Sequence, residues 1–282
     1  MKRYILILLL IPVTRAHSVA SIRTTDTFSD LTRMIDQLSP ESLIIFDVDK
    51  VIIERADPFE RGIKHLHDRT HTVRALNNPN SGIVKRIGHD RATELWSHYI
   101  QSAPRMIIDP QLLATLDQLR KKQIPYIALT QFLVGRDKTL KTMIDWHIHD
   151  LEQLGFKPNP PHRANKDLVF NQYSYQGTHP RYTRGFLFTH RAVEKGILLK
   201  QWLKTIDWSP DRIIMYDNKL SNVQSVKKIC RRMKIPFTGF VYTGAETLPW
   251  RINRSVAAAQ LDHLITHGVW ISADQITNGA AR

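Results

Sequence analysis

The stretch Leu43–Ile53, which reads LIIFDVDKVII, constrains the fold of this chain more than any other. Four apolar residues lead directly into Asp47 and Asp49, and three more follow Lys50. Such an apolar run is typical of a strand buried on both faces of a parallel sheet, whose carboxyl end faces the ligand crevice. Because an isolated buried carboxylate is costly, two aspartates at this edge indicate a metal, a counter-ion or an active site. The alternative is a strand followed by an Asp-rich turn.

Residues 1–20 have the layout of a secretory signal peptide. Two basic residues precede the apolar run Tyr4–Val13, and small residues follow, with cleavage after Ala20 or Ala16. The alternative is an uncleaved N-terminal anchor, although the run is short for a bilayer span. We therefore expect a mature chain of residues 21–282 that is exported to the periplasm or secreted, with no transmembrane segment.

The charge balance favours an anionic partner. The formal net charge is +14, and removal of residues 1–20 takes away Lys2, Arg3 and Arg15 and leaves +11. A basic chain suits phosphorylated substrates, nucleic acid or acidic membrane surfaces. The basic residues are scattered and no zinc-finger, RNA-recognition or helix-turn-helix pattern is present, so nucleic acid is the weaker interpretation.

Strands alternate with amphipathic helices along the rest of the chain. The apolar runs 124–129, 212–216 and 235–242 predict further strands. This alternation predicts an α/β fold, a doubly wound parallel sheet with helices on both faces. Residues about 54–105, rich in Arg, His and Asn, are predicted to form a mainly helical cap insertion after the paired aspartates. A smaller insertion is expected at about 157–190.

Several of the predicted strands end in a reactive residue. Asp47 and Asp49 follow the first strand, Thr130 the second and Asp217 the third, and Lys195 begins a helix. The carboxyl ends of parallel strands share one edge, so these groups can converge. One carboxylate can attack phosphorus, while a second can protonate the leaving oxygen and then activate water. A hydroxyl and an ammonium can hold the phosphoryl oxygens, and a further carboxylate can complete a Mg2+ site.

The order of these residues resembles the four motifs of the haloacid dehalogenase-like (HAD) superfamily of phosphohydrolases. The matching stretches, which span about 43–242, are Asp47-x-Asp49, Ala128-Leu129-Thr130, Lys195-Gly196 and Ile213–Val223. The chain also looks like an uncharacterised group of exported HAD-like proteins from host-associated bacteria, through Thr238-Gly239-Phe240, Tyr242–Ala245 and the closing segment Leu261–Ser272.

The resemblance implies a role for each matching residue. Asp47 would be the nucleophile and a metal ligand, and Asp49 the general acid and base, with its main-chain carbonyl on the metal. Thr130 and Lys195 would bind the phosphoryl group, and Asp217 would hold Mg2+. The implied function is a Mg2+-dependent phosphomonoester hydrolase with an aspartyl-phosphate intermediate, acting on a small phosphorylated substrate or a phosphoprotein.

Three positions depart from the family pattern. Asn218 and Ser221 occupy the two places where a second acid is common, and each is a candidate to order a metal-bound water. Lys50 stands where small or polar residues are commoner, and Val51 where Thr is frequent. The competing hypothesis is therefore a catalytically degenerate HAD-like protein that binds an anionic partner.

Other residues carry weaker signals. Lys200 is the fallback for Lys195 as the phosphate-binding lysine. The thirteen histidines include His147 and His149, but i,i+2 residues diverge on a helix and no zinc-ligand set is evident. The single cysteine, Cys230, excludes an internal disulfide.

Overall fold

A mixed, mostly parallel sheet forms the centre of the protein in this computed structural model, which describes residues 21–132, 140–175 and 177–279. Within these residues the main sheet runs in the order β1 (Ser21–Thr25), β10 (Phe237–Tyr242), β9 (Arg212–Asp217), β2 (Ser42–Phe46), β5 (Tyr126–Gln131), β8 (Phe186–Thr189), β7 (Arg181–Thr183) and β6 (Leu168–Val169). All pairs from β1 to β8 are parallel, and β7 and β6 add an antiparallel edge. The predicted α/β class is confirmed.

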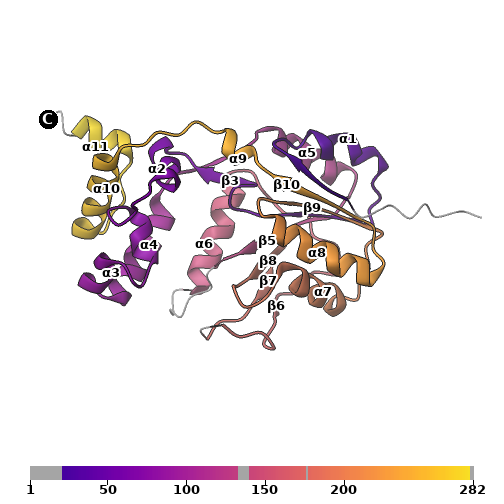
Figure 1. Ribbon diagram of the computed structural model, residues 1–282. Helices are drawn as coiled ribbons and strands as arrows, with labels where there is room; N and C mark the ends of the chain where they lie inside the picture. Colours follow the sequence, from indigo (N-terminus) through magenta and orange to yellow (C-terminus); the bar gives the residue numbers. More distant parts are fainter. Residues whose placement is uncertain (1–20, 133–139, 176, 280–282) are drawn as a thin grey trace, which may run out of the picture.

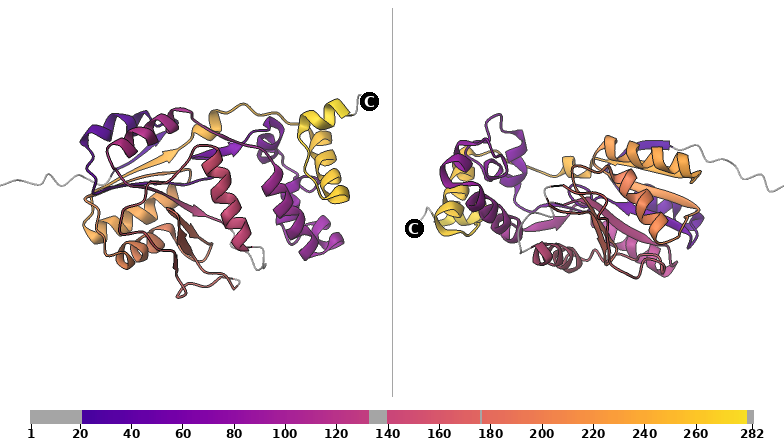
Figure 2. Two further views of the ribbon diagram at one scale, coloured as in Figure 1. Left: turned by 180° about the vertical axis from the view of Figure 1, so that it is seen from behind. Right: turned by 90° about the horizontal axis from the view of Figure 1, so that it is seen from below.

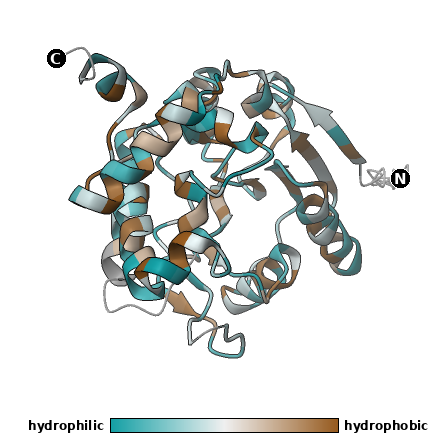
Figure 3. Ribbon diagram, turned by 60° about the vertical axis from the view of Figure 1, so that its left-hand side comes forward, coloured by the Kyte–Doolittle hydropathy of each residue, from teal (hydrophilic) through white to brown (hydrophobic). Residues whose placement is uncertain are grey.

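Helices cover both faces of the sheet because the central strands are apolar on both sides (Figure 1). On β2, Ile44 and Phe46 join one core cluster, and Leu43 and Ile45 join the other. The first cluster lies under α1 (Ser29–Met34), the short 3-10 turn η1 (Ile35–Gln37), α5 (Gln111–Lys121) and α6 (Leu140–Gln153). The second lies under α7 (Lys195–Thr205) and α8 (Leu220–Met233). Polar and apolar residues alternate along these helices (Figure 3), as expected of amphipathic helices on a core.

A helical cap stands apart from the sheet at one end of the molecule (Figures 1 and 2). A two-stranded antiparallel ribbon leads to it, made of β3 (Ile53–Arg55) and β4 (Arg105–Ile107), which pairs Arg55 with Arg105. Between these strands lie α2 (Pro58–Gly62), η2 (Ile63–His65), η3 (Val73–Asn77), α3 (Gly82–Ile87) and α4 (His89–Ser102). The ribbon is called the hinge ribbon below.

The C-terminal helices belong to the same cap. After the one-turn α9 (Gly244–Thr247), the chain crosses to α10 (Arg254–His267) and α11 (Ala273–Gly279). A separate apolar cluster joins the two parts, with Val73, Leu95 and Tyr99 packed on Leu264 and Trp270. The cap is therefore composite, with two parts far apart in the sequence.

Asp57 links these two parts of the cap through its buried carboxylate. Its Oδ1 accepts the backbone N–H of Phe59 at the start of α2 (2.8 Å). Its Oδ2 accepts the side-chain amide of Gln260 (3.3 Å) and the backbone N–H of Ala273 (3.0 Å). One carboxylate thus caps α2 and holds both C-terminal helices.

Some segments differ from what the sequence pattern indicated. The predicted strands did not include β1, whose polar sequence SIRTT lies at the sheet edge beside β10. The segment 157–190, expected to be a smaller insertion with short strands at 168–170 and 185–189, contributes β6, β7 and β8, of which β8 pairs directly with β5. The expected signal peptide at residues 1–20 lies outside the described residues. Among the described helices, none combines the length and apolar character required to cross a membrane.

Candidate functional site

Adjacent strands bring the predicted site residues to one edge of the sheet. Phe46 of β2 pairs with Tyr216 of β9, so the next residues, Asp47 and Asp217, emerge side by side. The backbone N–H of Asp47 also donates to the carbonyl of Tyr216 at 2.8 Å. Thr130, near the end of β5 on the other side of β2, is almost fully buried at the same edge. The carboxyl ends of three neighbouring strands therefore meet here.

Lys195 connects the two carboxylates. Its Nζ lies 2.8 Å from Asp47 Oδ1 and 2.7 Å from Asp217 Oδ2, and only 3% of the lysine is exposed. Burial alone would lower the pKa of Lys195, but the two carboxylates outweigh it and raise the pKa. The ammonium is therefore charged at neutral pH and neutralises part of the negative charge at the strand ends.

Close packing of two helices delivers this lysine. Lys195 is the first residue of α7, and the next residue is Gly196, whose N–H donates to Ser225 Oγ on α8 at 3.1 Å. A Cβ on Gly196 would lie 2.3 Å from the carbonyl oxygen of Ser225, so no larger residue fits without a shift. Glycine at position 196 therefore lets α7 approach α8 and places Lys195 over the strand ends.

Asp217 is completely buried, and several donors surround it. Its Oδ1 accepts the backbone N–H of Lys219 (2.8 Å), and the amide of Asn222 donates to both of its oxygens (3.0 and 3.1 Å). Burial raises the pKa of Asp217 to about 6, the charge of Asp47 adds to this rise, and Lys195 opposes it. Asn222 was not among the predicted site residues. It lies within the quoted fourth motif, and its place in the first turn of α8 was the available signal.

The candidates Asn218 and Ser221 do not share this arrangement. Asn218 is half-buried and Ser221 is exposed. Within the described residues, the side chain of neither makes a hydrogen bond. Asn222, five residues after Asp217, makes the contacts to the carboxylate instead.

Asp47 begins a tight turn that carries Asp49 and Lys50. The Oδ1 of Asp47 accepts the N–H of Val48 (2.9 Å), and the carbonyl of Val48 accepts three successive N–H groups, from Val51 to Ile53. Lys50 has a φ of 65°, in the left-handed region that residues with a Cβ rarely adopt. This turn buries Asp47, leaves Asp49 exposed and directs the chain into the hinge ribbon.

Direct contact thus unites three of the five residues predicted for catalysis, phosphate binding or metal binding: Asp47, Lys195 and Asp217. Thr130 and Asp49 lie at the same edge, and within the described residues neither side chain hydrogen-bonds to these three. The fallback Lys200 is exposed further along α7 and forms no such pair in the described part of the chain.

The oxygen donors at this edge fit a magnesium ion. The described residues contain no group of three or more His, Cys, Asp or Glu side chains suited to a metal. Mg2+, however, commonly takes one or two carboxylates and keeps waters in its other positions. Asp47 and Asp217 offer two carboxylates, and the main-chain carbonyl of Asp49 would be a third hard oxygen.

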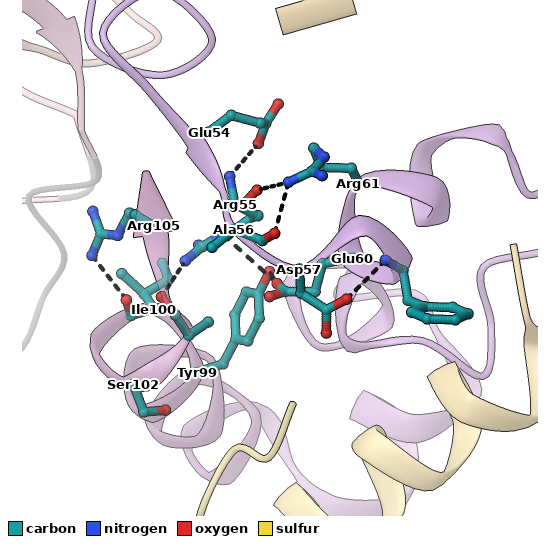
Figure 4. A network of polar contacts seen from close by, with 12 residues as sticks. Glu54, Arg55, Ala56, Asp57, Glu60, Arg61, Tyr99, Ile100, Ser102 and Arg105 are labelled. Atoms are coloured by element: carbon teal, nitrogen blue, oxygen red, sulfur yellow. Dashed lines mark hydrogen bonds and ion pairs between the residues drawn. The ribbon is translucent and has the colours of Figure 1, made fainter. Parts of the chain in front are cut away.

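A second polar cluster lies beside the hinge ribbon (Figure 4). Tyr99 of α4 donates a short hydrogen bond to the buried Glu60, whose Oε1 lies 3.8 Å from Arg55 Nε. The guanidinium of Arg55 also lies 4.6 Å from the centre of the Tyr99 ring. Burial raises the pKa of Glu60 to about 7, and Arg55 opposes this rise. The cluster therefore contains a carboxyl group that titrates near neutral pH.

Comparison with known proteins identifies the family. The model of the family described as "Protein of unknown function (DUF2608)" matches residues 24–277, nearly the whole chain. The chain belongs to this family. The DUF2608 match includes residues of the sheet, the hinge ribbon and both parts of the composite cap.

Two curated proteins are also similar to this chain. The "Uncharacterized protein RP296" of Rickettsia prowazekii is 20% identical over 86% of this chain and 84% of its own length. The "Putative outer membrane protein" of Chlamydia trachomatis serovar D is 32% identical over 68 residues, which are 24% of this chain and 26% of that protein. The chain thus matches only about a quarter of the chlamydial protein.

One solved structure is also similar, the "Hydrolase, haloacid dehalogenase-like family protein SP0104 from Streptococcus pneumoniae". It is 15% identical, with 72% of this chain and 95% of that chain covered at a TM-score of 0.36. Because this score is low, the fold class rests on the strand order of the DUF2608 protein itself.

Proposed function

We propose that this DUF2608 protein is an exported, Mg2+-dependent phosphomonoester hydrolase that acts through an aspartyl-phosphate on Asp47. The observation that carries the proposal is the bridge from Lys195 to Asp47 and Asp217 at the carboxyl edge of the sheet. A buried ammonium between two carboxylates neutralises charge where an anionic phosphoryl group would arrive. Sequence resemblance to the HAD superfamily assigns the same residues to phosphoryl transfer.

The hydrogen bonds of Asp47 indicate which of its oxygens attacks. Oδ1 is occupied by the N–H of Val48 and by Lys195. Within the described residues no hydrogen bond reaches Oδ2, so this oxygen is the proposed nucleophile. It would form a bond to phosphorus as the bond to the leaving oxygen breaks, with Lys195 and Thr130 holding the phosphoryl oxygens.

Asp49 would act at the leaving oxygen. Its exposure suits a group that donates a proton to the departing alcohol and then takes one from the attacking water. Water would break the acyl phosphate, release inorganic phosphate and restore the Asp47 carboxylate. When bound to Asp47, Asp217 and the Asp49 carbonyl, Mg2+ would supply positive charge that lets the anionic nucleophile approach phosphate.

The test is hydrolysis of p-nitrophenyl phosphate by the purified protein, with Mg2+ and with a chelator. We expect activity only with Mg2+, and a loss of at least about a thousandfold in Asp47→Asn. Asp36→Asn is the matched control, because Asp36 is an exposed aspartate paired with Lys122 and distant from the strand ends in sequence and fold. Equal activity in Asp47→Asn and Asp36→Asn would refute the proposal.

A binding protein without turnover is the second candidate. The hydrogen bonds to both oxygens of Asp217 favour it, because they compete with a metal for that carboxylate. Binding of inorganic phosphate without hydrolysis of any phosphate ester, with or without Mg2+, would select this alternative.

The proposed export rests on the pattern of residues 1–20. Mass spectrometry of the mature N-terminus would test it, and the expected start is residue 21 or residue 17. A protein that retains Met1 would contradict cleavage.

A further inference from the structure

Three cationic residues lie where the core joins the cap: Lys50, Arg55 and Arg105, called the hinge cations here. The N–H of Lys50 donates to the carbonyl of Ile53, the first residue of the hinge ribbon, at 2.8 Å. Arg55 ends β3 and pairs in register with Arg105, which begins β4. Lys50 and Arg55 thus lie in and just after the turn that contains Asp47 and Asp49, and Arg105 lies beside Arg55 on the second strand of the ribbon.

Lys50 combines an unusual backbone with an unbalanced charge. Its left-handed φ of 65° is disfavoured for a residue with a Cβ. In the described part of the chain no carboxylate lies within 4 Å of Lys50. Repulsion among the hinge cations would be relieved by a bound anion.

Arg105 has a donor to spare although its side chain is only 6% exposed. One terminal nitrogen donates to the carbonyl of Ile100 at 3.0 Å, and the other lies 3.4 Å from Asp150. Its guanidinium carbon lies 4.3 Å from the centre of the Trp146 ring. Its Nε is buried and, within the described residues, has no hydrogen-bond partner. A buried unpaired donor is costly, so a ligand acceptor here would be favourable.

Asp49 connects these cations to the proposed chemistry. Asp49 forms a β-bridge with Ile53, the first residue of the hinge ribbon, two residues before Arg55. Asp49 therefore lies at the start of the ribbon that carries both arginines. Because Asp49 is the proposed proton donor to the leaving oxygen, the leaving part of the substrate would lie among the hinge cations.

We infer that the hinge cations form a subsite for a second anionic group, a carboxylate or another phosphate, on the leaving part of the phosphate ester. The inference rests on the proposed function, which supplies the position of the first phosphate. Arginine suits this role because its planar donors match a carboxylate or a phosphate. The acids Asp49, Glu54, Glu60 and Asp150 surround the subsite and limit its affinity for a lone anion.

A pair of probes tests the inference by binding. Phosphoglycolate and hydroxyethyl phosphate differ only in a carboxylate against a neutral hydroxymethyl group. In the Asp47→Asn variant, which cannot turn them over, calorimetry is expected to show phosphoglycolate binding at least about tenfold more tightly. Propanediol bisphosphate, with a second phosphate instead, distinguishes the two forms of the subsite, because the better ligand identifies the second group.

Lys50→Asn in the same background should remove most of this preference, because asparagine tolerates a left-handed φ and carries no charge. Lys234→Asn is the matched control, since Lys234 is also a left-handed lysine (φ 57°) but ends α8 on the opposite side of the sheet. Arg105→Gln is the second variant if Lys50→Asn does not fold. Equal affinity for the three probes, or an unchanged preference in the folded variants, would overturn the inference.

Wild-type turnover separates this inference from the proposed function. Preferential binding of the two probes that carry a second anionic group, without hydrolysis, would support the subsite and contradict the phosphatase. Hydrolysis of all three probes with equal kcat/KM, and equal affinity in Asp47→Asn, would support the phosphatase and contradict the subsite.

Discussion

Lys195 is the residue on which the geometry of the site depends most. Its ammonium separates two carboxylates that would otherwise face each other with little solvent. Asp217, fully buried, already has its pKa raised to about 6. The ion pairs therefore hold the site in its charged form, and removal of the lysine should affect both stability and chemistry.

The substitution Lys195→Met is predicted to destabilise the protein by about 3 kcal/mol at about pH 8, because it leaves buried carboxylates without their counter-ion. The loss should be smaller at about pH 5. There Asp217, whose pKa rises further without the ammonium, takes up a proton and the repulsion disappears. Urea denaturation at both pH values measures this. Lys200→Met, at an exposed position of the same helix, should change stability by less than about 0.5 kcal/mol.

Glu60 should give the folding equilibrium a measurable pH dependence. Its pKa is raised from 4.5 to about 7 in the folded protein, so between these values the folded state holds a proton that the unfolded state has lost. Stability therefore falls as the pH rises through this window, by up to about 3 kcal/mol, and levels off above it. In Glu60→Gln the part of this fall that Glu60 causes should disappear and the part that Asp217 causes below about pH 6 should remain, while the exposed control Glu94→Gln should keep both parts. An identical pH profile in Glu60→Gln would contradict the assignment.

At this scale the sequence predicted the contacts that depend on strand ends. Asp47 and Asp217 emerge side by side because parallel strands fix where their ends lie, and Lys195 reaches both from the start of α7. Asn222 was missed because its role depends on how α8 begins after Lys219, a local geometry that residue types do not reveal. The left-handed φ of Lys50 was likewise unreadable, since lysine gives no signal for it.

Among the elements, the contact between α7 and α8 has the clearest link to the site. Gly196 allows the two backbones to approach, and it directly follows the residue that bridges the carboxylates. A displacement of the start of α7 would therefore move Lys195.

Gly196→Ala is predicted to destabilise the protein by about 1–3 kcal/mol, because its Cβ would overlap the carbonyl oxygen of Ser225. Phosphatase activity should fall with it, since Lys195 shifts. Gly82→Ala is the control. It is also a helical glycine, but no atom lies within 4 Å of the added Cβ, so its effect should be neutral or slightly stabilising. Equal effects of the two substitutions on thermal unfolding would contradict the packing argument.

The buried strands were predictable because apolar runs identify them, as in β2, β5, β9 and β10. The strands β1 and β7 were not predicted. β1 is polar and gains its place from hydrogen bonds to β10, and β7 is a short element beside β6 in a proline-rich region. Edge strands carry little apolar patterning because only their pairing, not their burial, defines them.

For the whole molecule, the composite cap was the feature that the sequence did not indicate. A segment directly after the aspartates was expected to cover the site, but the partner of the last helices was not evident. Hydrophobic periodicity predicts a buried helix face and cannot name the surface that buries it. In the structure, α10 and α11 complete the core of the cap.

Asp57→Ala is predicted to loosen the C-terminal helices from the rest of the cap. It removes the N-cap of α2, leaves the backbone N–H of Ala273 unpaired and leaves the amide of Gln260 with its bond to the Ile271 carbonyl alone, at a cost of about 2–3 kcal/mol. Hydrogen exchange should accelerate in α10 and α11 and remain unchanged in the central sheet. Glu94→Ala, which removes an exposed acid of the same cap that pairs with Arg91 on α4, should leave the exchange of α10 and α11 unchanged.

The most direct test of the account is the capture of the covalent intermediate. With radiolabelled p-nitrophenyl phosphate, whose nitrophenolate departs without a proton from Asp49, the Asp49→Asn variant should form the aspartyl-phosphate and hydrolyse it slowly, because water lacks its base. After incubation with this ester and Mg2+ and an acid quench, we predict label on the peptide that contains Asp47 and its release by hydroxylamine. No label, or label on a different peptide, would contradict the central claim that Asp47 is the nucleophile.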